Sequence, residues 1–178
     1  YVWFVASYFL SYPFMALCRI LGLTEIHHLP NKVICYEHRY HGNKPIALIW
    51  PWIRFLDLAI FVIFQVYLPL WRGFIVVCDR FIHDALVEVM VDVVDVRLHE
   101  KLVGRLMLKL KPKSSIVFLL DVDEKVAFRR KLDLSNLTYL VHRRRNYYLI
   151  ANDLRIPIIN AEGPFPLVHK EIIKQLEG

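Results

Sequence analysis

The chain has 178 residues, which is enough for one domain with a substantial core, and no obvious linker divides it. Its formal charge of +6 is concentrated in clusters at 129–131 and 143–145, which favours a compact anionic ligand over nucleic acid. An odd number of cysteines, three, excludes a simple disulfide framework and indicates a reducing, cytoplasmic compartment.

Strand-like and helix-like segments alternate along the chain. Short apolar runs rich in β-branched and aromatic residues predict strands, and apolar residues three and four positions apart predict helices. The predicted strands span 1–5, 74–78, 116–121 and 156–160. The predicted helices span about 9–22, 50–70, 84–111 with a break at 92–95, 123–131, 135–154 and 164–177, and 24–45 is predicted to be an irregular polar loop. Strands separated by helices imply right-handed βαβ crossovers, and therefore an α/β fold with a parallel sheet.

Two features concern the N-terminal half. The chain lacks an initiator Met and opens directly in a strand-like run, so we expect an upstream piece to be missing. The apolar stretch from Phe55 to Trp71 is interrupted by Asp57 and Gln65 and is shorter than the ~20 residues that span a bilayer. We therefore interpret it as a buried core helix, with a membrane segment as the alternative.

Two of the predicted strands end in an acid. The run 74–78 leads into Asp79-Arg80-Phe81, and the run 116–120 leads into Asp121. Such runs are typical of strands buried on both faces, and open α/β sheets bind their ligands at the carboxyl ends of these strands. Acids can hold a metal through its waters, and arginines neutralise phosphate oxygens. The pattern therefore predicts a phosphoryl-transfer site.

An arginine lies on the apolar side of the helix predicted over 135–154. Arg144 shares a stripe with apolar residues three and four positions apart, so it needs an anion or a carboxylate as a partner. We favour phosphate contact, and a structural salt bridge is the alternative. Asp121 and Asp123 alternate at a strand end, so we expect them to point to opposite faces, with Asp123 able to cap the next helix instead.

These residues, in this order, resemble the thymidylate kinase family of nucleoside-monophosphate kinases. The resemblance covers about residues 55–177. It rests on four pieces: Asp79-Arg80-Phe81 after a strand, the strand ending Leu120-Asp121-Val122-Asp123 with Ala127 and Arg130 behind it, the helix with Arg144-Arg145-Asn146-Tyr147, and the last strand ending Asn160-Ala161. It implies a single domain, 1–178, of the P-loop kinase type: a three-layer parallel sheet with helices on both faces and a lid at about 129–145. The glycine-rich phosphate loop is absent from the sequence, so we expect the first, central strand to be missing.

The resemblance also implies an activity: transfer of the γ-phosphoryl of ATP, with Mg²⁺, to a nucleoside monophosphate such as dTMP. The implied catalytic residues are Asp79, Arg130 and Arg144, with Asp79 also holding Mg²⁺ through water. The implied substrate-binding residues are Arg80, Phe81, His83 and Arg39, and those near ATP are Arg129, Asn160 and Ala161. The implied partners are these nucleotides, without nucleic acid or membrane, and a homodimer is left open.

Two further departures from the family pattern leave alternatives open. The base-reading Tyr-Gln pair after Asp-Arg-Phe is absent, so the acceptor base is undetermined, and the helix 55–70 lacks the arginine that the family usually places there. The alternatives are a non-catalytic, membrane-associated helical module and a degenerate kinase fold that only binds. Cys35, His38 and His41 offer too few ligands for zinc, so we expect a polar loop over the acceptor pocket. We expect the 178 residues on their own to be inactive.

Overall fold

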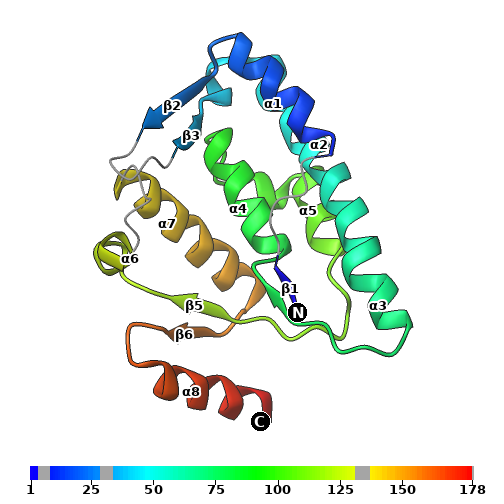
Figure 1. Cartoon of the computed structure of the whole chain (residues 1–178), viewed down its shortest axis with the longest axis vertical. Coiled ribbons are helices and arrows are strands. Elements are labelled where there is room, and N and C mark those ends of the chain that lie inside the picture. Colours follow the sequence, from blue (N-terminus) through cyan, green and yellow to red (C-terminus); the bar gives the residue numbers. More distant parts are fainter. Residues whose placement is uncertain (4–8, 29–33, 131–136, 178) are drawn as a thin grey trace. The chain divides into compact units, whose positions relative to one another are not determined.

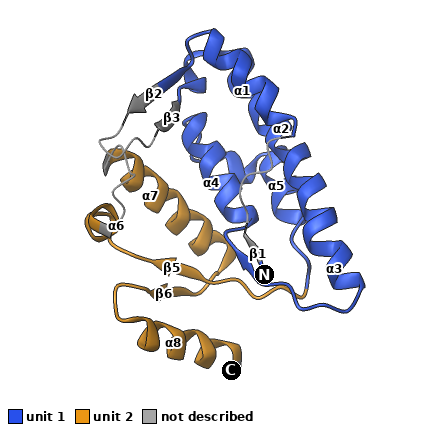
Figure 2. Cartoon of the chain, in the orientation of Figure 1, with its two compact units in different colours: residues 1–27, 36–113 blue, residues 28–35, 114–178 orange. Residues whose placement is uncertain are grey.

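The computed structural model describes residues 1–3, 9–28, 34–130 and 137–177, and these residues form a mixed α/β structure that is mostly helical (Figure 1). The coarse fold class is therefore confirmed. The chain divides into two compact units, each of which is described by itself (Figure 2). Unit 1 comprises Tyr1–His27 and Tyr36–Lys113, and unit 2 comprises His28–Cys35 and Ser114–Gly178.

Unit 1 is built mainly from helices. Its elements are β1 (Val2–Trp3), α1 (Ser11–Ile20), η1 (Tyr40–Gly42), α2 (Lys44–Val62), the π-helical turn η2 (Ile63–Tyr67), α3 (Leu68–Trp71), β4 (Cys78–Asp79), α4 (Ile82–Asp92), η3 (Leu98–Glu100) and α5 (Leu102–Lys109). The predicted break between two helices after residue 92 is confirmed, because α4 ends at Asp92 and α5 begins at Leu102.

The core of unit 1 lies around α4, which packs against both α2 and α5. The sequence of α4 is apolar on nearly all sides, which is typical of a helix surrounded by other elements. Its fully buried side chains are those of Ile82, Ala85, Leu86, Val87, Val89 and Met90, and they meet Leu58 and Val62 of α2 and Met107 of α5 in the same core.

Polar side chains anchor one face of α2 to its neighbours. The buried Asp57 carboxylate accepts hydrogen bonds from the backbone N–H groups of Leu10 and Ser11, at 2.7 and 2.8 Å, and from the Ser11 hydroxyl. It thereby caps the first turn of α1, where a negative charge is favoured. On the α4 side, the Trp50 indole donates to Asp92 at 2.9 Å. The buried Arg54 guanidinium donates to Glu88 at 3.3 Å.

The opposite face of this helix is not buried. Because α2, η2 and α3 run on without a break, Lys44–Trp71 is one helix of 28 residues, long and apolar enough by length and composition to cross a membrane. The prediction that the apolar stretch from Phe55 to Trp71 is too short to span a bilayer is therefore wrong, because the helix begins at Lys44, eleven residues before Phe55. Only 33% of its most apolar window is buried, so the interpretation as a buried core helix is correct for one face alone.

The segment 24–45, predicted to be an irregular loop, contains two strands. These are β2 (Thr24–His28) and β3 (Ile34–His38), which pair as a two-stranded sheet. The polar histidines of the segment hide its strand preference, but β-branched Thr24, Ile26 and Ile34 favour an extended backbone.

Unit 2 consists of a parallel strand pair with helices. Its elements are β5 (Leu119–Asp121), α6 (Glu124–Arg130), α7 (Leu137–Leu154), β6 (Ile158–Asn160) and α8 (Phe165–Glu177). Asp121 lies opposite Asn160 in the parallel β5–β6 register. In unit 1, β1 and β4 also pair in parallel, with Trp3 opposite Asp79. The predicted parallel strand orientation is confirmed for both pairs.

Both acid-ended strands are shorter and more exposed than predicted. Of the runs 74–78 and 116–121, only Cys78–Asp79 and Leu119–Asp121 are strands. Ile75 is 92% exposed and Ile116 is 63% exposed, so the prediction of strands buried on both faces is wrong. The physical reason is pairing: among the described residues, β1 pairs with Cys78 and Asp79 alone and β6 with 119–121 alone, so the earlier residues of each run have no ladder partner.

Four helices end in the same way. After α1, α3, α4 and α7, a residue with positive φ turns the chain, and the following N–H bonds back to a carbonyl five residues earlier. The positive-φ residues are Gly22, Gly73, Val94 and Arg155. The bonds are Leu23 to Cys18, Phe74 to Pro69, Asp95 to Met90 and Ile156 to Ala151. Two of these ends therefore use glycine and two do not.

Candidate functional site

The ten predicted site residues fall equally on the two units. Arg39, Asp79, Arg80, Phe81 and His83 belong to unit 1, and Arg129, Arg130, Arg144, Asn160 and Ala161 belong to unit 2. Two local constellations follow, one after β4 and one at the carboxyl ends of β5 and β6.

The constellation after β4 presents an acid and an arginine to solvent. Asp79 ends the strand, is exposed, and accepts a hydrogen bond from the Tyr1 hydroxyl at 3.0 Å. That bond raises the pKa of the Tyr1 phenol. The next residue, Arg80, has φ of +60°, a left-handed conformation that costs a non-glycine residue free energy. Such strain is often found at functional sites. Arg80 is the strained residue between the end of β4 at Asp79 and the start of α4 at Ile82.

The start of α4 is fixed by a local cap. The Phe81 backbone N–H donates to the Asp84 carboxylate at 2.7 Å, so an acid in the first turn holds the residue that precedes the helix. The next predicted residue, His83, is 8% exposed because it lies in the first turn of the buried helix α4. Burial lowers the pKa of His83 to about 4. The imidazole is therefore neutral at pH 7, and a contact of His83 with a substrate stays a prediction.

Arg39 lies apart from β4 in sequence and is paired. Its guanidinium is 2.6 Å from Glu25, and both side chains are about half exposed. This surface ion pair contributes little to stability. A phosphate contact of Arg39 stays a prediction.

In unit 2, Arg144 holds three carboxylates together. Its Nε donates to Asp121 Oδ1 at 2.9 Å and its Nη2 donates to Asp121 Oδ2 at 2.8 Å, which is a bidentate pair. Its Nη1 donates to Asp123 at 3.3 Å and to Glu124. The Tyr148 hydroxyl donates to Asp121 Oδ2 at 2.7 Å, and the Tyr148 ring lies under the guanidinium. The prediction that Arg144 needs an anionic partner is confirmed, and in this structure the partners are carboxylates.

The ion pairs shift the protonation equilibria of this cluster. Arg144, and then Tyr148, hold the pKa of Asp121 below its usual range, and Arg144 also lowers the pKa of Glu124. In turn, the hydrogen bond to Asp121 raises the pKa of Tyr148. The lowered pKa values of Asp121 and Glu124 keep these two carboxylates ionised beside the Arg144 guanidinium.

The expectation that Asp121 and Asp123 face opposite sides is wrong. β5 ends at Asp121, so the alternation of side chains stops there and the turn brings Asp123 to the same guanidinium. The expected cap is confirmed, because Asp123 accepts from the Lys125 N–H at 2.9 Å at the start of α6.

The end of β6 closes the same region. The Ala161 N–H donates to the Asp121 carbonyl at 2.8 Å, and the Glu162 N–H donates to the Asn160 side chain at 2.8 Å. Glu162 in turn accepts from the Asp123 N–H at 3.0 Å. The segment after Asn160 is thus held beside Asp121, at the edge of the pair where parallel sheets bind ligands.

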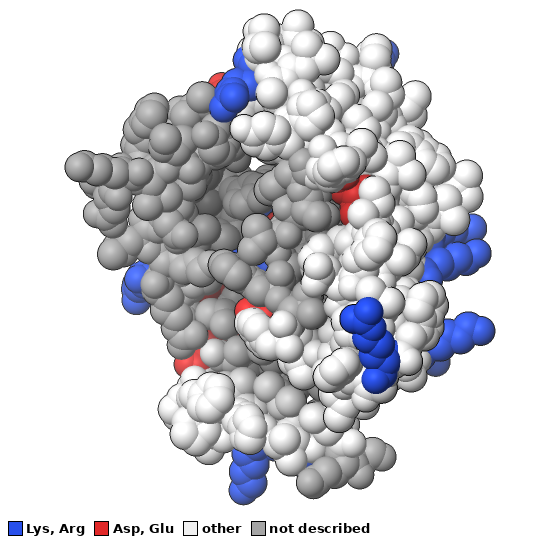
Figure 3. Space-filling view, turned by 45° about the vertical axis from the view of Figure 1, so that its right-hand side comes forward, with Lys and Arg blue, Asp and Glu red and all other residues white. Residues whose placement is uncertain are grey.

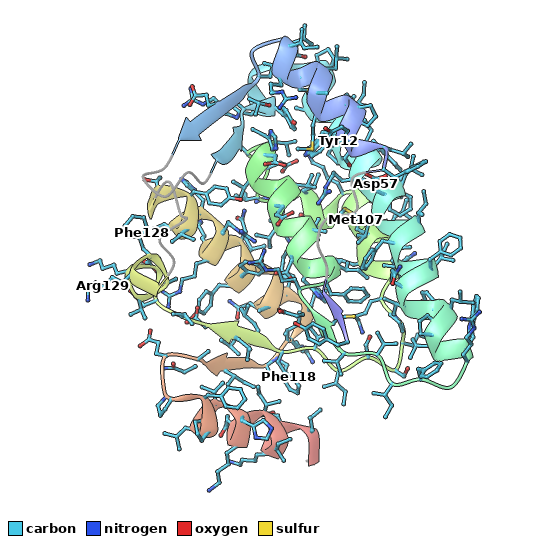
Figure 4. All side chains as sticks on the ribbon, in the orientation of Figure 1. Tyr12, Asp57, Met107, Phe118, Phe128 and Arg129 are labelled. Carbon is cyan, nitrogen blue, oxygen red and sulfur yellow. The ribbon has the colours of Figure 1, made fainter. Side chains whose placement is uncertain are left out.

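The other arginines of the predicted lid lie on α6 and α7. Arg129 is exposed on α6 (Figure 4). Arg130 is the last residue of α6, its side chain is outside the described residues, and residues 131–136 of the predicted lid are outside them as well. On α7, Arg143 lies over the rings of Tyr139 and Tyr147.

A buried polar network in unit 1 was not predicted. Arg54 is 4% exposed, and its guanidinium lies 5.7 Å from the centre of the Trp50 ring. It stands one position before the segment 55–70, which lacks the arginine that the family usually places there. The Trp50 ring also belongs to a cluster with Phe14, His38 and Tyr40. Burial, and then Arg54, lower the pKa of His38 to about 4. The sequence does contain a signal for this network, because two charged residues, Arg54 and Asp57, stand three positions apart inside an apolar helix.

No protein-family model matches the chain, and no curated protein matches it. The family resemblance therefore rests on the motifs in this sequence alone.

Proposed function

We propose that the chain is a thymidylate kinase-like phosphotransferase, which uses ATP and Mg²⁺ to phosphorylate a nucleoside monophosphate. The observation that carries the proposal is the pairing of the strands. Two parallel pairs, β1–β4 and β5–β6, each bring an acid to a carboxyl end, Asp79 in one and Asp121 in the other.

The strand order supports the finer fold. In the family, the strand that carries the phosphate loop lies between the strands that correspond to β4 and β5. Among the described residues, β4 pairs with β1 alone and β5 pairs with β6 alone. Each of these two strands therefore has one unpaired edge. Both pairs are parallel, as the two halves of one parallel sheet must be. The parallel direction of both pairs is what a three-layer sheet of the P-loop kinase type requires, and it supports this finer fold.

The proposed roles follow from the two constellations. Exposed Asp79 holds Mg²⁺ through water, and Arg80, fixed by its unusual backbone, grips the acceptor phosphate with Phe81 beside it. Arg144 and the lid arginines Arg129 and Arg130 stabilise charge on the transferring phosphoryl group. The segment of Asn160 and Ala161 lies near ATP.

If Arg144 contacts the transferring phosphoryl group, its guanidinium must bind a phosphate oxygen in addition to, or in place of, its carboxylate partners. Four of the five N–H groups of the guanidinium point to carboxylate oxygens, so a phosphate oxygen would bind the remaining N–H of Nη2 or replace one of these carboxylates during turnover. The bond to Asp123, at 3.3 Å, is longer than either bond to Asp121 and is the contact most easily exchanged.

The test is phosphotransfer by the full-length protein with ATP, Mg²⁺ and a panel of nucleoside monophosphates. Arg80→Ala should raise the acceptor KM and lower kcat/KM by roughly 2–4 kcal/mol of transition-state stabilisation, because a charged hydrogen-bond partner of the phosphate is lost. The matched control is Arg105→Ala, which removes an exposed arginine from α5 and should leave the kinetics unchanged. Wild-type kinetics for Arg80→Ala would refute its role, and nucleotide binding without turnover would favour the degenerate, binding-only alternative.

Arg144→Lys separates catalysis from structure. Replacing a planar fork by a point charge should reduce kcat if Arg144 contacts the phosphoryl group. If the melting temperature falls while kcat stays intact, Arg144 is a structural ion-pair partner of Asp121 only.

A further inference from the structure

The long helix Lys44–Trp71 carries an exposed apolar face that runs along most of its length. We call this face the outer stripe. From Leu48 to Ile60 its members recur every three or four positions, so they share one side of α2. Ile63 and Phe64 follow in the π-helical turn η2, and Trp71 ends α3. The members of the outer stripe are Leu48, Ile49, Trp52, Leu56, Ile60, Ile63 and Phe64, with exposed fractions from 39 to 71%, and Trp71, which is 75% exposed.

The charges of the helix are segregated from the outer stripe. Between its ends the helix contains two charged residues, Arg54 and Asp57, and both are buried against neighbouring helices. The exposed cations Lys44 and Arg72 lie at the two ends of the helix. Figure 3 turns the right-hand side of Figure 1 forward, and most of the described surface on that side belongs to uncharged residues, with a few Lys, Arg, Asp and Glu side chains among them.

From this arrangement we infer that the outer stripe binds the surface of an anionic lipid bilayer, with the helix lying in the plane of the membrane. An apolar stripe enters the acyl boundary, and flanking cations meet anionic headgroups. Trp52 and Trp71 are of the residue type that favours the interface between the two regions. The inference does not rest on the proposed phosphotransferase activity.

The same contacts argue against a helix that crosses the bilayer. Spanning would place Arg54 and Asp57 near the middle of the hydrocarbon. It would also break the bonds from Leu10 and Ser11 to Asp57 and from Arg54 to Glu88, which attach the helix to α1 and α4. A helix lying on the surface keeps all of these contacts and inserts only the outer stripe.

The experiment is sedimentation of the full-length protein with vesicles of phosphatidylcholine alone or with about 30% phosphatidylserine. The wild type should bind the anionic vesicles more tightly and lose binding as salt is raised. Leu56→Gln with Ile60→Gln should weaken binding at least about tenfold, because two inserted side chains lose their apolar contact. The matched control, Phe165→Gln with Leu167→Gln, changes two exposed apolar residues of α8 and should stay within about twofold.

A second pair of variants tests the charges. Lys44→Gln with Arg72→Gln should reduce binding to anionic vesicles, whereas Lys170→Gln with Lys174→Gln, two exposed lysines of α8, should not. Bound protein should be released by alkaline carbonate.

Three results would overturn the inference. The first is equal vesicle binding by the wild type and the outer-stripe variant, or none by either. The second is resistance to carbonate, which would mean that the helix spans the bilayer. The third is a wild-type dimer that the outer-stripe variant converts to a monomer without any binding to lipid, which would assign the stripe to a second copy of the chain.

Discussion

Single residues in this chain owe their protonation states to burial as much as to neighbouring charges. In unit 1, His83 is buried and His38 is half-buried, and desolvation lowers the pKa of each to about 4. Because both imidazoles are neutral in the folded protein at pH 7, unfolding in mild acid must add protons to them. The stability of unit 1 should therefore depend on pH well above the range in which carboxylates titrate.

His83→Gln tests this dependence. The unfolded histidine takes up a proton near its ordinary pKa of 6.5 and the folded one near 4, so the unfolded state binds more protons between these values. The free energy of unfolding should then fall as pH falls from 6.5 to 4, by up to about 1.4 kcal/mol per pH unit from this residue. Urea unfolding at several pH values should give a shallower slope for His83→Gln. His142→Gln, at an exposed position, should keep the wild-type slope, and equal slopes for all three proteins would contradict the assignment.

The sequence allowed some residue roles to be predicted and not others. Arg144 could be predicted to need an anion because its place on an apolar stripe of α7 is a local property of the sequence. Asp57 could be seen only as an interruption of an apolar run, since the residues that it binds lie 46 and 47 positions away. A capping partner at that distance leaves no periodic signal.

Among the elements, most helix ends were predicted more closely than the extents of β4 and β5, although α2 begins at Lys44 rather than at about residue 50. Helical hydrogen bonds are local, so the periodicity of α4, α7 and α8 carries most of the information about them. The extent of β4 and β5 depends on the strands beside them, and an apolar run such as 74–78 does not specify its neighbours. The two acids of the candidate site were found because strand ends are marked by a change from apolar to charged residues.

The attachment of α1 to α2 is a property of the two elements together, and Asp57→Ala tests it. The variant leaves two N–H groups and one hydroxyl at the start of α1 without their buried acceptor, so we expect a loss of about 2–4 kcal/mol in the free energy of unfolding. Gln65→Ala, at an exposed position of the same helical segment, should change it by less than about 0.5 kcal/mol. Equal effects in chemical denaturation would show that the cap contributes nothing.

For the molecule as a whole, stability in the described residues rests on helices more than on sheets. Each sheet has two strands, and an isolated two-stranded sheet is marginal in water. The buried side chains of unit 1 lie mostly on α2, α4 and α5. The mixed α/β class followed from the alternation of segments, but the number of strands per sheet could not, because it is set by non-local pairing.

The shared ending of four helices makes the protein open to stabilisation by design. Val94 and Arg155 adopt φ of +53° where α1 and α3 use glycine, and both side chains are exposed, so little packing would be lost on their removal. Val94→Gly and Arg155→Gly should each raise the free energy of unfolding by about 1 kcal/mol, as the left-handed backbone ceases to cost energy. Thermal melts of the single and double variants would measure the gain, and a lower melting temperature would contradict it. Stability can therefore be raised at two helix ends that hold none of the proposed site residues, and the gain would offset the destabilisation that mutations for new activity usually bring.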